Sequence, residues 1–281
     1  MKIIRDVKGM QAVTERLQLE GKTIGFVPTM GYFHEGHLSL MRITRERADI
    51  VVVSIYVNPS QFGPNEDLNK YPRDFERDEA LAEKEGVDIL FFPDDSEMYP
   101  KGYQTYVFVG GITDVLCGTS RPAHFRGVTT ICTKLFHIIK PHFAVFGQKD
   151  YQQAIVIQRM VRDLNFDMEI MIGPIVREKD GLAMSSRNVY LSAESRKSAL
   201  SLNKSLRMAE QMIRKGERSA DVLINSIRRH IESKPETKID YVSIVHPATL
   251  QPLDRIEDCA VIALAVFVDK TRLIDNVIIE I

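Results

Sequence analysis

The positions of the apolar residues predict alternating strands and helices over the first two-thirds of the chain. Residues 49–57 form a short, β-branched apolar run typical of a buried strand, whereas residues 37–48 place apolar side chains at positions 38, 40, 41 and 43, as an amphipathic helix does. Strands are expected at residues 23–28, 49–57, 87–92, 142–146 and 168–172, and helices at residues 37–48, 74–85, 128–139 and 151–164. This order predicts a Rossmann-like α/β fold, a doubly wound parallel sheet covered by helices.

The pattern changes after about residue 173. Helical patterns at residues 193–215 and 220–233 are followed by strand patterns at residues 239–245, 260–268 and 277–281. Helices followed by neighbouring strands are typical of an α+β domain. We therefore expect a Rossmann-like domain at residues 1–175 and a smaller α+β domain at residues 176–281, with the boundary falling between residues 174 and 188.

Composition and charge narrow the class of protein. The chain has 281 residues, 44% of them hydrophobic, which is typical of a globular protein with a sizeable core. The net charge of -1 argues against nucleic-acid binding, although a few local cations suffice for a small anion. No apolar stretch approaches the roughly 20 residues of a membrane span, and the N-terminus lacks a signal-peptide pattern. Three cysteines without a CxxC pair suit the cytoplasm.

The first candidate for chemistry is PTMGYFHEGH at residues 28–37, where a predicted strand gives way to a predicted helix. In a doubly wound sheet, ligands bind outside the carboxyl ends of the strands, and a helix N-terminus there favours phosphate. Gly31 and Gly36 allow the backbone to approach a ligand. His34 and His37 are three residues apart, so both can donate hydrogen bonds to phosphate oxygens from one side of the first turn.

Three further segments follow strands or lie in loops. GQKDYQQ at residues 147–153 places a lysine, an aspartate and two glutamines after a predicted strand. MSSRN at residues 184–188 offers two hydroxyls and an arginine, which suit phosphate. NPSQF at residues 58–62 places Gln61 beyond another strand, where it can bind a hydroxyl or carboxylate.

Each of these segments also has a simpler explanation. A single histidine is often a surface or cap residue, and Asp150 alone is best explained as a helix N-cap. Zinc binding by the histidines is disfavoured, because the zinc protease motif spaces its histidines four apart rather than three. Ser-Ser-Arg is common in solvated loops. The basic loop at residues 120–127 contacts an anion or only solvent, and the residues alone do not decide between the two.

Six motifs together resemble the pantothenate synthetase family. PTMGYFHEGH, NPSQF, YPRDFERD, HFRGV, FGQKDYQQ and REKDGLAMSSRN occur in the order and spacing of that family, nearly from end to end. HEGH alone indicates only the wider superfamily that includes nucleotidylyltransferases and class I aminoacyl-tRNA synthetases. The resemblance implies an ATP-dependent ligase that joins (R)-pantoate to β-alanine through a pantoyl-adenylate. It also implies Mg²⁺, a C-terminal lid and a homodimer.

The resemblance also implies which residues bind ATP. These are Met30, Gly31, Tyr32, Phe33, His34, Glu35, Gly36, His37, Gly147, Gln148, Lys149, Asp150, Val176, Met184, Ser185, Ser186 and Arg187. Those implied to act in catalysis are His34, His37, Lys149, Ser185, Ser186 and Arg187. In this family both histidines contact the phosphates, and His37 is the residue usually assigned as proton donor. The resemblance implies that Lys149 contacts phosphate, that Asp150 lies near the ribose and that Val176 lies near adenine. It also implies that residues 184–187 form a flexible phosphate loop.

The remaining implied roles concern the other substrates and the metal. Gln61 and Gln153 match the glutamines that bind pantoate, and Gln61 also helps to receive β-alanine. Asp78 matches a position linked to Mg²⁺, and Arg121 and His124 match positions near the active site. Ser60 replaces the Thr or Met expected before Gln61, a mild departure that leaves Gln61 unaffected.

Two other classes of protein remain open from the residues alone. A nucleotidylyltransferase of the same superfamily shares the histidine motif, but it does not account for the NPSQF, GQKDYQQ and MSSRN segments together. A nucleotide sensor or RNA-binding module would not release pyrophosphate with any acid. The near-neutral charge and the lack of a basic, aromatic stripe argue against RNA.

Overall fold

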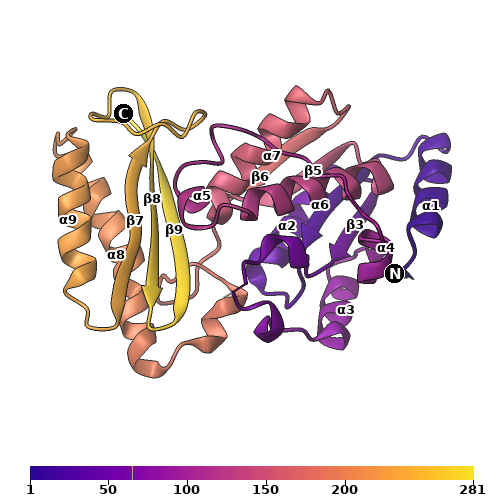
Figure 1. The fold of residues 1–281 in the computed structure, drawn as a ribbon, viewed down its shortest axis with the longest axis horizontal. Helices are drawn as coiled ribbons and strands as arrows, with labels where there is room; N and C mark the ends of the chain where they lie inside the picture. The colour runs from indigo at the N-terminus through magenta and orange to yellow at the C-terminus, as the bar shows by residue number, and fades with distance from the viewer. Residues whose placement is uncertain (65) are drawn as a thin grey trace. The chain divides into compact units, whose positions relative to one another are not determined.

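A computed structural model describes residues 1–64 and 66–281, which form two compact units (Figure 1). The first unit comprises Met1–Gly110, Arg121–Gln148 and Gln153–Pro174, and the second comprises Gly111–Ser120, Lys149–Gln152 and Ile175–Ile281. The longest segment of the second unit thus begins near the expected boundary. The unit also includes two short segments that the sequence pattern assigns to the N-terminal domain. Contacts between residues far apart in sequence join such a segment to the rest of the second unit. One example is the hydrogen bond from the Tyr151 hydroxyl to the Pro247 carbonyl (3.1 Å).

The first unit contains the predicted parallel sheet. Its six strands run in the order β1-β4-β3-β2-β5-β6, and every pair is parallel. The strands are β1 (Lys2–Ile4), β2 (Ile24–Thr29), β3 (Ile50–Ile55), β4 (Ile89–Phe91), β5 (Phe143–Gly147) and β6 (Glu169–Gly173). The doubly wound fold is therefore confirmed. The edge strand β1 was not predicted, because three residues are too few to show a pattern.

Helices cover both faces of this sheet. They are α1 (Val7–Leu19), α2 (Glu35–Arg45), α3 (Phe75–Lys84), α4 (Asp95–Met98), α6 (His124–Ile139) and α7 (Tyr151–Asp163), with 3-10 turns at η1 (Pro59–Gln61), η2 (Leu68–Lys70) and η3 (Gln148–Asp150). We did not predict α1. Residues 124–127, predicted as part of a loop, form the first turn of α6, so that prediction was wrong there.

Alternate side chains of the strands bury the two faces of the sheet. Val27 and Val53 belong to the same core cluster as Met41 of α2, whereas Phe26 meets Phe136 of α6 edge to face, with ring centroids 6.3 Å apart. Because successive side chains of a strand point to opposite faces, both faces are dry and the strands are apolar throughout.

The order of the strands determines where a ligand can bind. From β2 the chain goes to β3 on one side, whereas β5 pairs with β2 on the other, with Phe26 opposite Ala144. Outside the carboxyl ends of β2 and β5 the connections diverge, and such a switch point is the usual ligand site of an open α/β sheet. The loop after β2 begins at this point, and β5 ends there at Gly147.

The second unit is a helix pair packed on an antiparallel sheet (Figure 1). Its strands pair in the order β7-β8-β9, and β8 is almost entirely buried. The elements are α5 (Cys117–Ser120), η4 (Ser186–Tyr190), α8 (Ala193–Arg214), α9 (Ala220–Glu232), β7 (Thr237–Val245), β8 (Cys259–Val268) and β9 (Thr271–Glu280). The α+β architecture is confirmed. In the described part of the chain, no helix combines the length and the apolar character needed to cross a membrane.

Candidate active site

The loop between β2 and α2 has an unusual backbone conformation. Gly31 and Tyr32 both have positive φ angles, 82° and 53°. Such angles are unfavourable for a residue with a side chain, so surrounding contacts must hold the loop. The Thr29 hydroxyl accepts a hydrogen bond from the Gly31 N–H (3.1 Å). The Asp78 carboxylate accepts from the N–H groups of Tyr32 (2.5 Å) and Phe33 (2.7 Å).

His34 and His37 lie together at the start of α2. His34 is the N-cap, and its Nδ1 accepts a hydrogen bond from the Gly36 N–H (3.1 Å). The Nδ1 of His37 accepts from the His34 N–H (3.3 Å), and the two ring centroids are 4.1 Å apart. Since a neutral imidazole with an accepting Nδ1 carries its proton on Nε2, both rings present an Nε2–H donor. Two such donors beside the positive end of a helix dipole suit phosphate oxygens.

Glu35 belongs to a different environment from the histidines. Its carboxylate pairs with the guanidinium of Arg42, about two turns further along α2, and both side chains are about half exposed. Arg42 also pairs with Glu85 (2.8 Å). The predicted contact of Glu35 with ATP is therefore best understood as a backbone contact at the first helical residue.

Gln61 is held by a network around the turn η1. The Asn58 amide Nδ2 donates to the Gln61 Oε1 (3.0 Å) and to the Gly127 carbonyl (3.1 Å), which leaves the carboxamide of Gln61 with Nε2 as its donor end. The Gln61 carbonyl accepts from Arg121 Nη2 (3.2 Å) and lies 2.9 Å from His124 Nδ1. Arg121 and His124, predicted near the active site, thus surround the backbone of Gln61.

The two glutamines at the start of α7 have different environments. Gln152 is 6% exposed, and its carboxamide accepts from the Cys117 N–H (3.0 Å) and donates to the carbonyls of Ile112 (2.9 Å) and Val115 (2.7 Å). Gln153 is half-buried. Gln152 is therefore fully used in holding residues 112–117, which favours Gln153 as the ligand-binding glutamine.

Lys149 and Asp150 belong to the second unit and Gly147 and Gln148 to the first. The Lys149 ammonium lies 3.6 Å from the Asp150 carboxylate, and its carbonyl accepts a hydrogen bond from the Asn276 side chain (3.0 Å). The main chain of Lys149 is thus fixed by β9, while its long side chain carries the charge.

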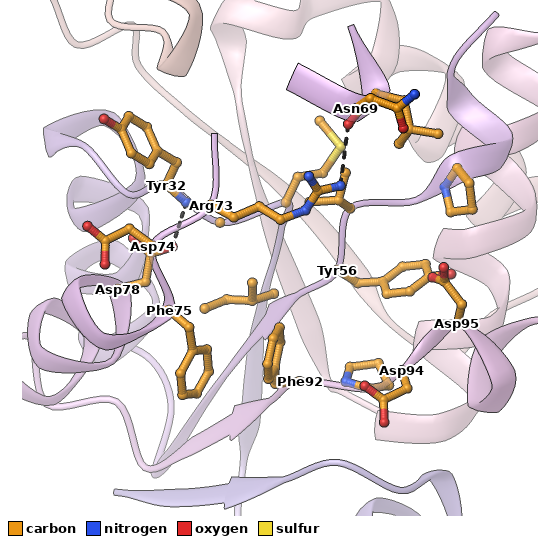
Figure 2. A pocket seen from close by; sticks show the side chains of 17 residues that line it. Tyr32, Tyr56, Asn69, Arg73, Asp74, Phe75, Asp78, Phe92, Asp94 and Asp95 are labelled. Carbon is orange, nitrogen blue, oxygen red and sulfur yellow. Dashed lines mark hydrogen bonds between the residues drawn. The ribbon is translucent and has the colours of Figure 1, made fainter. Parts of the chain in front are cut away.

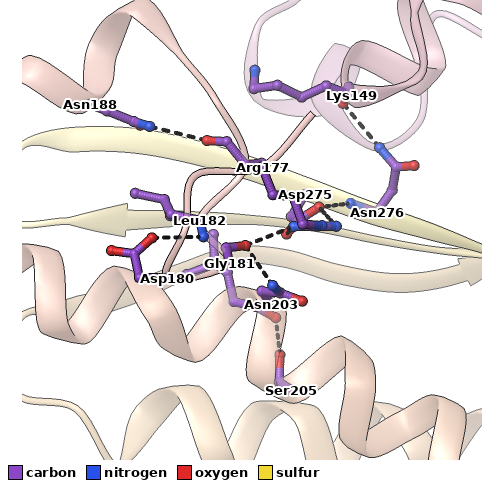
Figure 3. Close-up of polar contacts among 12 residues, drawn as sticks. Lys149, Arg177, Asp180, Gly181, Leu182, Asn188, Asn203, Ser205, Asp275 and Asn276 are labelled. Atoms are coloured by element: carbon purple, nitrogen blue, oxygen red, sulfur yellow. Dashed lines mark hydrogen bonds and ion pairs between the residues drawn. The ribbon is translucent and has the colours of Figure 1, made fainter. Parts of the chain in front are cut away.

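The predicted phosphate loop at residues 184–187 follows a hairpin in the second unit. The Arg177 guanidinium makes two hydrogen bonds to the Asp275 carboxylate, 2.7 and 2.9 Å long, and Asp275 is 3% exposed (Figure 3). The Met184 N–H donates to the Val176 carbonyl (3.0 Å). The Ser185 hydroxyl accepts from the Arg187 N–H (3.2 Å) and so begins η4. The loop therefore starts from a rigid base.

A cavity of about 390 Å³ opens at the carboxyl ends of β2, β3 and β4 (Figure 2). It is lined by Met30, Gly31 and Tyr32 of the loop after β2, by Tyr56 after β3, and by Asp78. Burial raises the pKa of the Asp78 carboxyl above its usual range, despite the opposing hydrogen bonds from Phe33 and Tyr32. The cavity thus borders the loop between β2 and α2 that leads to the two histidines.

Asp78 is poorly suited to bind a magnesium ion in this structure. Asp78 is 1% exposed, and each of its oxygens already accepts a backbone N–H. Residues 1–64 and 66–281 contain no group of three or more His, Cys, Asp or Glu side chains suited to a metal. Asp78 therefore holds the loop in this structure, and its predicted role as a magnesium ligand gains no support.

Comparison with known proteins identifies the family. A profile of the family described as pantoate-beta-alanine ligase matches residues 2–278. This chain belongs to the pantoate–β-alanine ligase family. The pantothenate synthetase of Syntrophus aciditrophicus is 59% identical over 98% of this chain and 96% of its own. That of Acetivibrio thermocellus is 57% identical over 100% of both chains.

Solved structures of pantoate–β-alanine ligases share the fold. Pantothenate synthetase from Thermus thermophilus matches with a TM-score of 0.94 at 45% identity, over 99% of both chains. The pantoate–β-alanine ligase of Francisella tularensis, solved in complex with beta-gamma ATP and β-alanine, matches with a TM-score of 0.82 at 34% identity, over 99% of this chain and 97% of that one. The family that the six motifs indicated is confirmed.

Sequence reasoning did not show which contacts hold the candidate site in place. Asn58 and Gly127 position Gln61, Arg177 and Asp275 hold the base of the phosphate loop, and Asp78 holds the histidine loop. Most of these residues lie inside the motifs NPSQF, HFRGV, REKDG and YPRDFERD, and this location was the one sign in the sequence that they could matter. Spacing alone does not show which backbone group a side chain will reach.

Proposed function

We propose that this chain condenses (R)-pantoate with β-alanine, consuming ATP and releasing AMP and pyrophosphate, through a pantoyl-adenylate. The observation that carries the proposal is the pair of imidazoles of His34 and His37 at the N-terminus of α2, each with its Nδ1 accepting a backbone N–H, in a chain that belongs to the pantoate–β-alanine ligase family. The site needs no covalent protein nucleophile, because ATP itself activates the carboxylate.

In the first step, a pantoate carboxylate oxygen attacks the α-phosphorus of ATP. The bond from that phosphorus to the bridging oxygen breaks, and pyrophosphate leaves with the electron pair. Negative charge grows on the phosphate oxygens, where His34 and His37 donate hydrogen bonds and Lys149 supplies a positive charge. Ser185, Ser186 and Arg187 add further donors to the phosphates. The backbone of residues 30–37 and 147–150, with Val176 and Met184, completes the ATP site.

In the second step, the neutral amine of β-alanine attacks the acyl carbon of the adenylate. The bond from that carbon to the phosphate oxygen breaks, AMP leaves, and the nitrogen loses a proton to give the amide. Gln61 and Gln153 hold pantoate by its hydroxyl and carboxyl oxygens, and Gln61 is oriented for this by Asn58. Such alignment of two reactants is worth about 7–11 kcal/mol of barrier.

Magnesium enters this scheme as part of the substrate, MgATP. Mg²⁺ commonly binds to substrate phosphates and keeps several waters, so it does not require a cage of protein ligands. The cation neutralises charge on the phosphate oxygens, which complements the histidine and lysine donors.

The adenylate is prone to hydrolysis and must be kept from water between the two steps. We propose that residues 1–175 bind ATP and pantoate and that residues 176–281 act as a lid, since lid closure excludes water in many enzymes. Hydrogen exchange of residues 174–190 should slow when ATP and pantoate are added. Unchanged exchange in every nucleotide state would contradict the lid.

We further propose a cytoplasmic homodimer. The exposed aromatic residues Tyr106 (50%) and Phe108 (67%) offer apolar surface for a second copy. Phe108→Glu should then shift the mass measured by light scattering toward the monomer. An unchanged dimer mass would exclude this surface, and a wild-type monomer would refute the dimer.

The test of the proposed function is ATP–pyrophosphate isotope exchange with pantoate and Mg²⁺ but without β-alanine. Pantoate-dependent exchange is expected, because the adenylate forms reversibly before the amine is needed. Exchange that requires a phosphorylated acceptor instead would favour a nucleotidylyltransferase. Intact ATP binding with no AMP released, even after β-alanine is added, would favour a nucleotide sensor and overturn the ligase.

A further inference from the structure

We propose that Asp78 and Arg77 are positioning residues that fix the orientation and the tautomer of the His37 imidazole. They are neighbours in α3, 40 or more positions from the histidines in sequence. Their effect on rate rests on the proposed function, whereas their effect on the imidazoles does not. The connection runs through three consecutive peptide groups between Gly31 and His34.

Asp78 holds the first two of these peptide groups. Its Oδ2 accepts from the Tyr32 N–H (2.5 Å, Figure 2). Its Oδ1 accepts from the Phe33 N–H (2.7 Å). The carboxylate also fills the space beside Gly31, where an added Cβ would lie 3.0 Å from Oδ2. Asp78 is 1% exposed, so water does not compete for these bonds. The carboxylate thereby stabilises the positive φ angle of Tyr32, a backbone conformation that is unfavourable for any residue with a side chain.

Arg77 holds the third peptide group. Its Nη2 donates to the Phe33 carbonyl (2.8 Å), and its guanidinium lies over the Tyr32 ring, 5.1 Å from the centroid. The Asp74 side chain accepts from the Arg77 N–H (3.2 Å) and caps the helix that carries both residues. The side chain of Arg77 is 45% exposed, so its removal leaves the core intact.

The third peptide group leads directly to the histidines. The Phe33 carbonyl and the His34 N–H belong to one planar unit, so holding the carbonyl aims the N–H. That N–H donates to the Nδ1 of His37 (3.3 Å). A donor at Nδ1 places the proton of His37 on Nε2, the nitrogen proposed to face phosphate. Arg77 and Asp78 therefore act on the imidazole through the backbone and contact no substrate.

The experiment compares Asp78→Asn, Arg77→Met and the control Glu76→Gln. The asparagine side chain would keep the shape of the aspartate but set an amide donor against one of the two N–H groups. Arg77→Met keeps an apolar stem over Tyr32 and removes the donor. Glu76 is exposed and lies in the same turn of α3 as Arg77 and Asp78. Glu76→Gln therefore removes one negative charge, as Asp78→Asn does, without changing a contact to the loop before α2.

The first measurement is the imidazole ¹⁵N spectrum, assigned with His34→Gln and His37→Gln. We expect a single Nε2–H tautomer of His37 in the wild type and in Glu76→Gln, and a mixture of tautomers in both other variants. The second measurement is pantoate-dependent exchange, in which kcat should fall on the order of 10- to 100-fold in Asp78→Asn, with the Mg²⁺ concentration for half-maximal rate unchanged. Arg77→Met should show a smaller fall.

Two results would overturn the proposal. One is an unchanged His37 tautomer in Arg77→Met and in a folded Asp78→Asn. The other is a raised Mg²⁺ requirement in Asp78→Asn without a change in tautomer, which would make Asp78 a metal ligand. If Asp78→Asn fails to fold, Arg77→Met decides. Absence of exchange in the wild type would defeat the proposed function, yet the spectra would still decide this inference.

Discussion

Replacing Gly127 with alanine should disable the pantoate site by moving Gln61. Gly127 lies in the first turn of α6, directly against the turn η1. An added Cβ would stand 2.3 Å from the Ser60 carbonyl oxygen and 2.8 Å from the Gln61 nitrogen. Ordinary van der Waals contact begins at 3.4 Å, so the backbone of η1 must retreat by about 1 Å.

The magnitude follows from that displacement. A misplacement of about 1 Å in a positioning group can lower a rate about 100-fold. We therefore expect kcat/KM for pantoate to fall about 100-fold, while the KM for ATP changes little. Forcing a methyl into the packed contact should also lower the free energy of unfolding by about 1–3 kcal/mol. Steady-state kinetics and thermal unfolding measure the two effects separately.

Gly110→Ala is the matched control. The added Cβ there would lie 3.5 Å from the Phe108 ring, an ordinary contact, so both stability and kinetics should stay near wild type. Wild-type kinetics in a folded Gly127→Ala variant would refute the reasoning, because it would show either that η1 moves freely or that Gln61 does not bind pantoate. Equal losses in both variants would show that the substitution itself, rather than the contact, is responsible.

The remaining predictions concern chemistry, reactivity and stability. His37→Ala and Lys149→Ala should each lose at least about 10- to 1000-fold in pantoate-dependent pyrophosphate exchange while keeping a wild-type melting temperature; near-normal exchange would remove the residue from the phosphate site. Burial raises the pKa of the Cys132 thiol to about 12, so a thiol reagent should label exposed Cys259 in the native protein, and Cys132 only after unfolding, even at about pH 9. Asp275→Asn removes the charge that its arginine partner meets in a buried ion pair, and should lower the free energy of unfolding by about 2–3 kcal/mol; a melting temperature within about 1–2 °C of wild type would contradict this.

Hydrophobic periodicity was sufficient for the long elements and insufficient for the short ones. The five predicted strands of the parallel sheet exist because β-branched runs such as residues 50–55 are buried on both faces. The strand β9 was predicted only over its last residues, since Arg272, Asp275 and Asn276 interrupt the apolar pattern. Asp275 and Asn276 are buried there because each makes hydrogen bonds that satisfy it, and a sequence does not display such partners.

The start of α6 shows the same limit. The residues from Ser120 to Gly127 contain a proline, a glycine and basic residues, which are typical of a loop. Gly127 is nevertheless helical, because its missing side chain admits the carbonyl of Ser60. A glycine that weakens an isolated helix is thus favoured by a contact between distant segments.

The sequence by itself determined the class of fold, the two-part organisation and the family, because periodicity and motifs are local properties that survive without coordinates. It also placed both histidines at a helix start beyond a strand. Only the tertiary structure decided what holds them: Asp78 and Arg77 reach the backbone before His34 from another helix, and Asn58 and Gly127 set Gln61. These contacts join segments tens of residues apart, and their geometry exists only once the sheet has brought the segments together.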